Sequence, residues 1–175
     1  MKPHERVRAG LFLAFQSPNE VPGVSLAAFL RRAYVARFGR EVSVLEFDRI
    51  LGEKMKLLGM EKGFSERGVN EGFSGGEKKR SEILQLAVLQ PKVALLDELD
   101  SGLDVDALSR ISEMLKMIRK KDTAIVIVTH YARILKGLKA DAVHVMRDGK
   151  IILSGDERLA HKLEDEGYAW AYRNA

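Results

Sequence analysis

The chain has 175 residues, of which 46% are hydrophobic and 31% charged. This composition suits one medium globular domain and excludes a disordered or fibrous chain. It contains no cysteine, so disulfide frameworks and iron–sulfur ligation by cysteine thiolates are excluded within it. The 29 basic and 25 acidic residues give a net charge of +4. Because the two signs are interspersed, we expect a solvated surface and no nucleic-acid partner.

The first residues are basic and run into a short apolar stretch at Leu11–Phe15. This stretch is too short for a signal peptide, and no run in the sequence approaches the length of about 18 apolar residues that a spanning helix needs. We therefore expect an untargeted, cytoplasmic protein without direct membrane insertion.

Five apolar runs predict buried strands: Leu11–Phe15, Val93–Leu96, Ala124–Val128, Ala142–Met146 and Ile151–Leu153. The first three lead directly into polar residues, at the place where open α/β sheets carry their chemistry. Asp148 and Gly149 predict the turn of a terminal hairpin between the last two runs.

Helical patterning between and after these runs predicts four helices, near 25–38, 43–59, 75–89 and 104–120. The pattern indicates an α/β fold in which residues 17–85 form a helical subdomain. This subdomain is inserted into a sheet domain that consists of residues 1–16 and 86–175.

Two adjacent carboxylates, Asp97 and Glu98, follow the second run. They repel one another unless a positive group lies beside them, and Mg²⁺ with a phosphate chain would supply it. Because successive side chains of an extended segment point in different directions, Asp97 could hold Mg²⁺ while Glu98 faces an attacking water as a base. An ordinary strand end with exposed acids is the alternative.

Capping explains several residues at the starts of two helices. Asp104 is placed to cap the helix that follows it, and Ser74 with Glu77 forms an S-x-x-E capping box. Gly75 and Gly76 are not explained in this way, because glycine weakens a first helical turn but lets another group approach the backbone. The amides of this turn would then form an anion site.

Two further polar residues follow predicted strands. Gln16 comes directly after the first run and by itself indicates only a turn. His130 follows the third run; a histidine is more often structural, but this position favours a functional role.

A phosphate-binding loop of the form G-x-x-x-x-G-K-[ST] is absent from the sequence. The run from Gly63 to Gly68 has the glycine spacing but is followed by Val69 and Asn70, and no strand is predicted before it. We interpret this run as a loop.

Taken together, L-L-D-E-L-D-S-G-L-D at 95–104 resembles the Walker B strand and D-loop of ABC ATPases, and S-G-G-E-K-K-R at 74–80 resembles their signature sequence. Gln16 then resembles the Q-loop glutamine and His130 the switch histidine. The resemblance implies three sets of site residues. Glu98, His130 and Gln16 would be catalytic, and Asp97 and Gln16 would bind the Mg²⁺ that accompanies ATP. The ATP of the opposing subunit would be contacted by Ser74, Gly75, Gly76 and Glu77, and the dimer interface would include Ser101, Gly102 and Asp104.

Variants within these motifs closely resemble one family of ABC ATPases, the SufC family of the SUF iron–sulfur cluster assembly system. They are Gly10–Gln16, Val21–Ser25, Ser74–Arg80 and Glu98-Leu99-Asp100 where transporter subunits usually carry E-P-T. The resemblance covers essentially the whole chain. It implies a partial RecA-like ABC ATPase core, a P-loop NTPase fold without its N-terminal strands and P-loop, with an inserted helical subdomain that bears the signature.

The resemblance also implies ATP and Mg²⁺ as cofactors and a transient head-to-tail homodimer. SufB and SufD type scaffold proteins are the implied partners, contacted through the helical insertion and the Q-loop. Because the family's first strands and phosphate loop should precede residue 1, we expect the chain alone to bind ATP very weakly, to lack turnover and to expose an apolar sheet face. The alternatives are a transporter's nucleotide-binding subunit and a non-catalytic interaction module.

Overall fold

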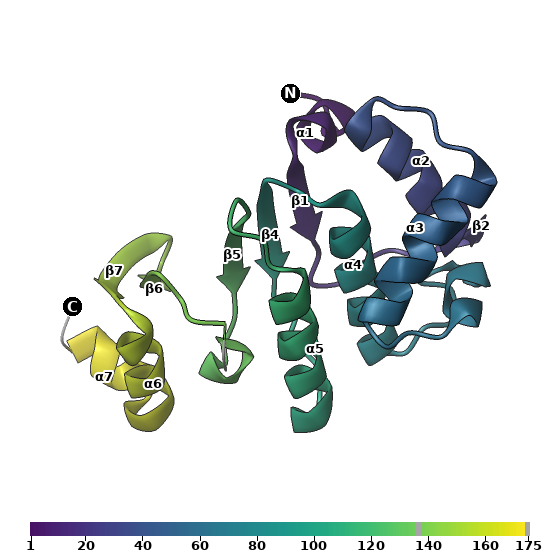
Figure 1. Ribbon diagram of the computed structural model, residues 1–175. Helices are drawn as coiled ribbons and strands as arrows, with labels where there is room; N and C mark the ends of the chain where they lie inside the picture. Colours follow the sequence, from purple (N-terminus) through teal and green to yellow (C-terminus); the bar gives the residue numbers. More distant parts are fainter. Residues whose placement is uncertain (136–137, 174–175) are drawn as a thin grey trace.

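A three-stranded parallel sheet forms the centre of the computed structural model, which describes residues 1–135 and 138–173. The strands lie in the order β1 (Leu11–Ala14), β4 (Val93–Asp97) and β5 (Ala124–Val128), as Figure 1 shows. Leu11 pairs with Val93, which in turn pairs with Ala124. All three strands therefore end at the same edge, and the predicted α/β class is confirmed.

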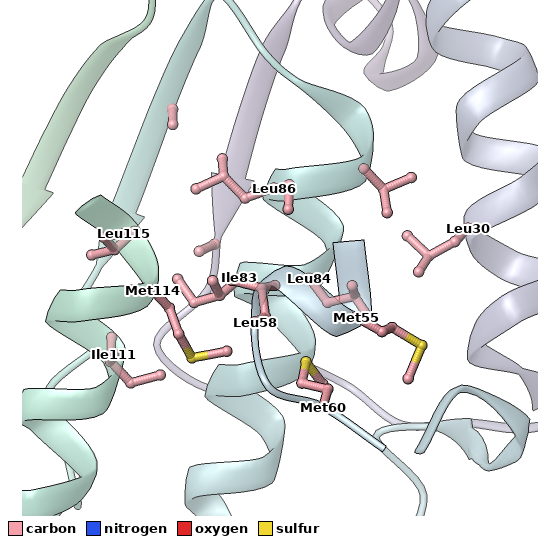
Figure 2. Packing of buried hydrophobic residues seen from close by; sticks show 14 of the residues in the cluster. Leu30, Met55, Leu58, Met60, Ile83, Leu84, Leu86, Ile111, Met114 and Leu115 are labelled. Atoms are coloured by element: carbon pink, nitrogen blue, oxygen red, sulfur yellow. The ribbon is translucent and has the colours of Figure 1, made fainter. Parts of the chain in front are cut away.

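Helix α4 (Gly75–Leu89) is the central helix of the core. It packs between α5 (Val105–Ile118) on one side and α2 (Leu26–Phe38) with α3 (Val44–Leu57) on the other. Figure 2 shows its apolar side chains reaching both groups of helices. Apolar burial of this kind stabilises by roughly 25 cal/mol per Å², so α4 joins the sheet to the helices of the insertion.

The opposite face of the sheet is apolar and largely exposed in the described part of the chain. Leu13 and Phe15 are 44% and 57% exposed, and Val126 and Val128 are 52% and 53% exposed. The expectation that the strands are buried is therefore wrong for this face, because α4 and α5 cover only the other one. The expected uncovered apolar face is present.

The segment before α2 contains two elements that the sequence pattern did not predict. Helix α1 (Pro3–Ala9) precedes β1, and β2 (Val21–Ser25) pairs with the short strand β3 (Gly68–Val69) in antiparallel fashion. The Pro-Gly pair inside β2 hides its strand character from a periodicity analysis.

The run from Gly63 to Gly68 is not only a loop. Residues Lys62–Glu66 form a 3₁₀ helix, η1, and Gly68 begins β3. The four predicted helices correspond to α2, α3, α4 and α5, with bounds that differ by a few residues. The division of the chain at residues 16 and 85 remains a prediction.

The predicted hairpin consists of β6 (Val143–Arg147) and β7 (Lys150–Gly155). Asp148 and Gly149 form its turn with φ values of 50° and 76°, as an I′-type turn requires. The hairpin is not terminal, because α6 (Glu157–Glu166) and α7 (Tyr168–Arg173) follow it.

The 3₁₀ helix η2 (Ala132–Leu135) follows β5 and contacts both α5 and α6. Among the helices of the described residues, none is both long enough and apolar enough to cross a membrane.

Candidate active site

The common edge of the parallel sheet brings the three predicted catalytic side chains together. Gln16 donates from Nε2 to Oε2 of Glu98 at 2.5 Å, and Nε2 of His130 lies 2.8 Å from Oε1 of the same carboxylate. Each carboxylate oxygen of Glu98 thus has one partner from a neighbouring strand end. Three residues that are far apart in the sequence form one hydrogen-bonded network.

Glu98 has an unusual backbone conformation. Its φ of 43° lies in the left-handed region, which costs a non-glycine residue on the order of 1–3 kcal/mol and is concentrated at functional sites. The N–H of Glu98 still donates to the carbonyl of Val128 at 3.0 Å, so β5 holds the turn in place. This conformation points the Glu98 side chain toward Gln16 and His130.

Asp97 is the last residue of β4 and is exposed beside this network. Mg²⁺ prefers hard oxygen donors. The carboxylate of Asp97 is one such donor, and Oε1 of Gln16 is another, because the hydrogen bond of Gln16 to Glu98 involves only its Nε2. The described residues contain no cluster of three or more His, Asp or Glu that could hold a metal without other ligands. These donors therefore fit Mg²⁺ only when water and a phosphate chain complete its shell.

The start of α4 has the predicted capping box. The N–H of Glu77 donates to Oγ of Ser74 at 3.2 Å, and the N–H of Ser74 donates to Oε2 of Glu77 at 2.8 Å. These bonds lower the pKa of Glu77, with the Ser74 N–H contributing most and Arg67 next. Ser74 and Glu77 thus order the first turn of the helix.

The two glycines of this turn have no structural reason within the described part of the chain. A Cβ at Gly75 would meet no atom within 4 Å, and one at Gly76 would meet only Leu103, at 3.9 Å. Neither glycine has a positive φ. The expectation that the amides of this turn bind an anion remains a prediction.

Arg67 supports the same turn, and the sequence analysis missed it. Its Nη1 lies 2.5 Å from Oε1 of Glu77, its Nη2 donates to the carbonyl of Gly72 at 3.2 Å, and its guanidinium lies 4.1 Å from the ring centroid of Phe73. Arg67 precedes β3, and only the fold brings it to the helix.

The turn after β4 leads into α5 through a second cap. Asp104 accepts from the N–H of Ala107 at 2.7 Å, so its predicted capping role is confirmed. Ser101 and Gly102 are exposed on this turn, where Gly102 has a φ of 73°. The interface role of Ser101, Gly102 and Asp104 remains a prediction.

Two buried charges of α4 lie directly beneath Gln16. Lys79 donates to the carbonyls of Phe15 and Gln16 at 3.2 and 2.8 Å, and Glu82 accepts from the N–H of Phe15 at 2.9 Å. Burial raises the pKa of Glu82 to about 7, and burial lowers the pKa of Lys79. The sequence analysis missed Glu82, whose only signal is a charge inside an otherwise buried helix.

Comparisons with known proteins agree with this arrangement. The chain is 56% identical over 167 residues to a "Probable ABC transporter ATP-binding protein" of Streptococcus pyogenes, and the match covers 94% of the chain and 65% of that protein. It is 49% identical over 172 residues to a "Probable ATP-dependent transporter" of Synechocystis, with coverages of 96% and 67%. The chain thus spans about two thirds of the length of these relatives. No protein-family model matches it.

A solved structure shows the same fold. The dimeric structure of MJ0796, a bacterial ABC transporter cassette, matches with a TM-score of 0.74 at 20% identity, covering 90% of this chain and 68% of the other. The described elements thus have the arrangement of an ABC cassette, which confirms the predicted RecA-like fold with its helical insertion.

Proposed function

Because this chain belongs to the family of ABC-type ATP-binding proteins, we propose that it carries the catalytic edge of a SufC-type ATPase. Such an ATPase couples ATP binding and hydrolysis to iron–sulfur cluster assembly on SufB and SufD type scaffold proteins. The observation that carries the proposal is the network in which Gln16 and His130 each hold one carboxylate oxygen of Glu98.

The chemistry assigned to this edge is in-line hydrolysis of the γ-phosphate. Glu98 accepts a proton from the attacking water as general base, and Gln16 orients that water. His130 holds Oε1 of Glu98 and would contact the γ-phosphate. Mg²⁺, held by Asp97 and Gln16 together with ATP, would neutralise charge on the phosphates.

The open first turn of α4 supports a role in a dimer. Ser74, Gly75, Gly76 and Glu77 would contact ATP bound by the opposing copy of a transient head-to-tail homodimer, because backbone amides at a helix start attract phosphate. The absence of any steric need for Gly75 within the described residues favours this assignment. Ser101, Gly102 and Asp104 would lie at the same interface.

One buried residue supports the SUF-type assignment. Asp100 stands where transporter subunits usually carry threonine, and its Oδ2 accepts from Oγ1 of Thr129 at 2.6 Å. Asp100 therefore has a hydrogen-bonding role inside the buried turn after β4. Since the chain has no cysteine, the cluster would be assembled on the partner, in the cytoplasm, and not ligated by thiolates here.

A G-x-x-x-x-G-K-[ST] sequence does not occur within these 175 residues. We therefore include in the proposal that this polypeptide by itself binds ATP very weakly and shows no turnover. Robust hydrolysis by the isolated 175-residue chain would contradict this part of the proposal.

The test compares Glu98→Gln with wild type in the complex purified from the native cells, because the isolated chain is expected to show no turnover. We expect co-purification with soluble SUF-type scaffold proteins and a loss of phosphate release of about 100-fold or more in the variant. The exposed Glu113 provides the matched control, because Glu113→Gln removes the same charge from α5. Equal rates in Glu98→Gln and wild type would refute the catalytic assignment.

The same purification separates the two alternatives. The names of the relatives favour a transporter subunit, which would co-purify with a membrane partner. A non-catalytic interaction module would tolerate Glu98→Gln in cluster assembly but would not tolerate substitutions on the surface of α2 and α3.

A further inference from the structure

Lys79 and Glu82, the oppositely charged pair inside α4, expose only 3% and 4% of their surfaces. A buried charge costs several kcal/mol unless it is paired or hydrogen-bonded. A helix that packs on both sides would be more stable with apolar residues at these positions. The contacts of the two side chains therefore have to account for their presence.

Both side chains bind the backbone of the two residues that follow β1. The ladder between β1 and β4 ends at Ala14, so the next peptide groups lose their strand partners. Lys79 binds the carbonyls of Phe15 and Gln16, and Glu82 binds the N–H of Phe15. Three polar groups of the Phe15–Gln16 backbone are thus satisfied from α4.

This backbone determines where the Gln16 side chain can reach. Gln16 is exposed, so the packing of its own side chain does little to fix it, yet its Nε2 lies 2.5 Å from Oε2 of Glu98. We propose that Glu82 and Lys79 are positioning residues, which hold the Phe15–Gln16 backbone so that the amide of Gln16 reaches Glu98.

The two positioning residues, Lys79 and Glu82, which we call the clamp, lie on the same helix as the glycine-rich turn. Lys79 and Glu82 lie on the same helix as Gly75 and Gly76, and an α-helix advances about one turn every 3.6 residues. The residues that hold Gln16 therefore lie about one to two turns from the glycine-rich turn, on the same helix.

The electrostatics of the clamp agree with the geometry. Attraction to Glu82, Asp100 and Asp97 partly restores the pKa of Lys79, which burial lowers. Oε2 of Glu82 has no hydrogen-bond partner among the described residues, so the bond to the Phe15 N–H is the hydrogen bond that supports this carboxylate, beside its attraction to Lys79. Removal of that bond should increase the hydrogen exchange of the Phe15 amide.

The inference rests on the proposed function, because Gln16 has a chemical role only if Glu98 takes part in hydrolysis. The position of Gln16 can nevertheless be measured without nucleotide. A failure of the clamp is therefore distinguishable from a failure of the ATPase assignment.

The experiment uses ¹⁵N NMR on the 175-residue chain. Glu98→Ala is the reference variant, because it removes the carboxylate that accepts from the side-chain amide of Gln16. In Glu82→Ala, the exchange rate of the Phe15 amide proton should rise about tenfold. The side-chain NH₂ signal of Gln16 should move toward its position in the reference. Glu82→Gln should restore both signals in large part, because its amide oxygen can accept the same bond.

Lys79→Met is the second variant, because it places an apolar side chain in a buried position and removes the two carbonyl contacts together with the charge of Lys79. It should shift the Gln16 NH₂ signal in the same direction, and it decides the test alone if Glu82→Ala does not fold. Glu113→Gln is the control and should leave both signals unchanged. Gln16 signals that stay at their wild-type positions in both Lys79→Met and folded Glu82→Ala would overturn the inference.

Discussion

Thr129 donates from Oγ1 to Oδ2 of Asp100 at 2.6 Å and thereby ties the end of β5 to the buried turn after β4. Asp100 is only 3% exposed, and its Oδ1 has no partner among the described residues. The bond from Thr129 is therefore the main compensation that we find for burying this carboxylate. It also lies directly before His130, so it helps to place the histidine.

The first prediction concerns this bond. Thr129→Val keeps the shape of the side chain but leaves the buried carboxylate without its donor and the N–H of Tyr131 without its acceptor, so the free energy of unfolding should fall by about 1–3 kcal/mol. Urea unfolding of the purified chain measures the change. Thr129→Ser keeps the hydroxyl and should lose no more than about 0.5 kcal/mol; equal losses in the two variants would contradict the assignment to the hydrogen bond.

The second prediction follows from the pKa of Glu82, which burial raises to about 7 from an ordinary value of 4.5. Between these values the folded state holds a proton that the unfolded state has released. The free energy of unfolding therefore falls as pH rises from about 4.5 to 7, by up to about 3 kcal/mol. Below this window both states are protonated, and the contribution is constant.

Glu82→Gln removes the titration, so its unfolding free energy should change less with pH than that of wild type. Urea unfolding at several values between about pH 5 and 8 measures the difference. The pKa of Glu77 is lowered, so Glu77 contributes stability that is lost only as pH falls below about 4.5. Identical pH slopes in Glu82→Gln and wild type would refute the prediction.

That Gln16, Glu98 and His130 lie at one edge of the sheet was predictable, because this follows from the topology of the sheet. Parallel strands end at one edge, and Gln16, Glu98 and His130 each follow such an end. The contributions of Arg67 and Glu82 were not predictable, since each acts across the fold on a segment distant in sequence. No local pattern records such contacts.

The exposure of the sheet could not be read from the strand pattern either. In β5, Ile125 and Ile127 pack against the core, while Val126 and Val128 are half exposed. Both pairs are β-branched and apolar, so periodicity gives no sign of which face is covered. Coverage is decided by α4 and α5, which lie elsewhere in the chain.

The third prediction concerns the cap of α4. Ser74→Ala removes the acceptor for the N–H of Glu77 and should cost about 1 kcal/mol of unfolding free energy. Ser74→Asp keeps an acceptor and a favourable charge at the helix start, so it should restore most of that loss. Ser109→Ala, at an exposed position of α5, is the control for removing a hydroxyl. A loss in Ser109→Ala as large as that in Ser74→Ala would show that the effect is not capping.

The fourth prediction concerns the exposed face of the sheet. The double variant Val126→Thr and Val128→Thr keeps β-branched side chains but makes the exposed face more polar. It should bind less of a hydrophobic dye than wild type and associate less in sedimentation experiments. Its unfolding free energy should change by no more than about 1 kcal/mol, since half-exposed surface residues contribute little.

The opposite face of the same strand supplies the control. Ile127 packs against the buried cluster, so Ile127→Thr places a hydroxyl in an apolar setting and should cost about 1–3 kcal/mol. If the double variant loses as much stability as Ile127→Thr, its side chains are buried in solution, by another copy of the chain or by a partner. If it retains its stability while dye binding falls, the face is open in the isolated chain, and the sheet is then covered on one side only by α4 and α5.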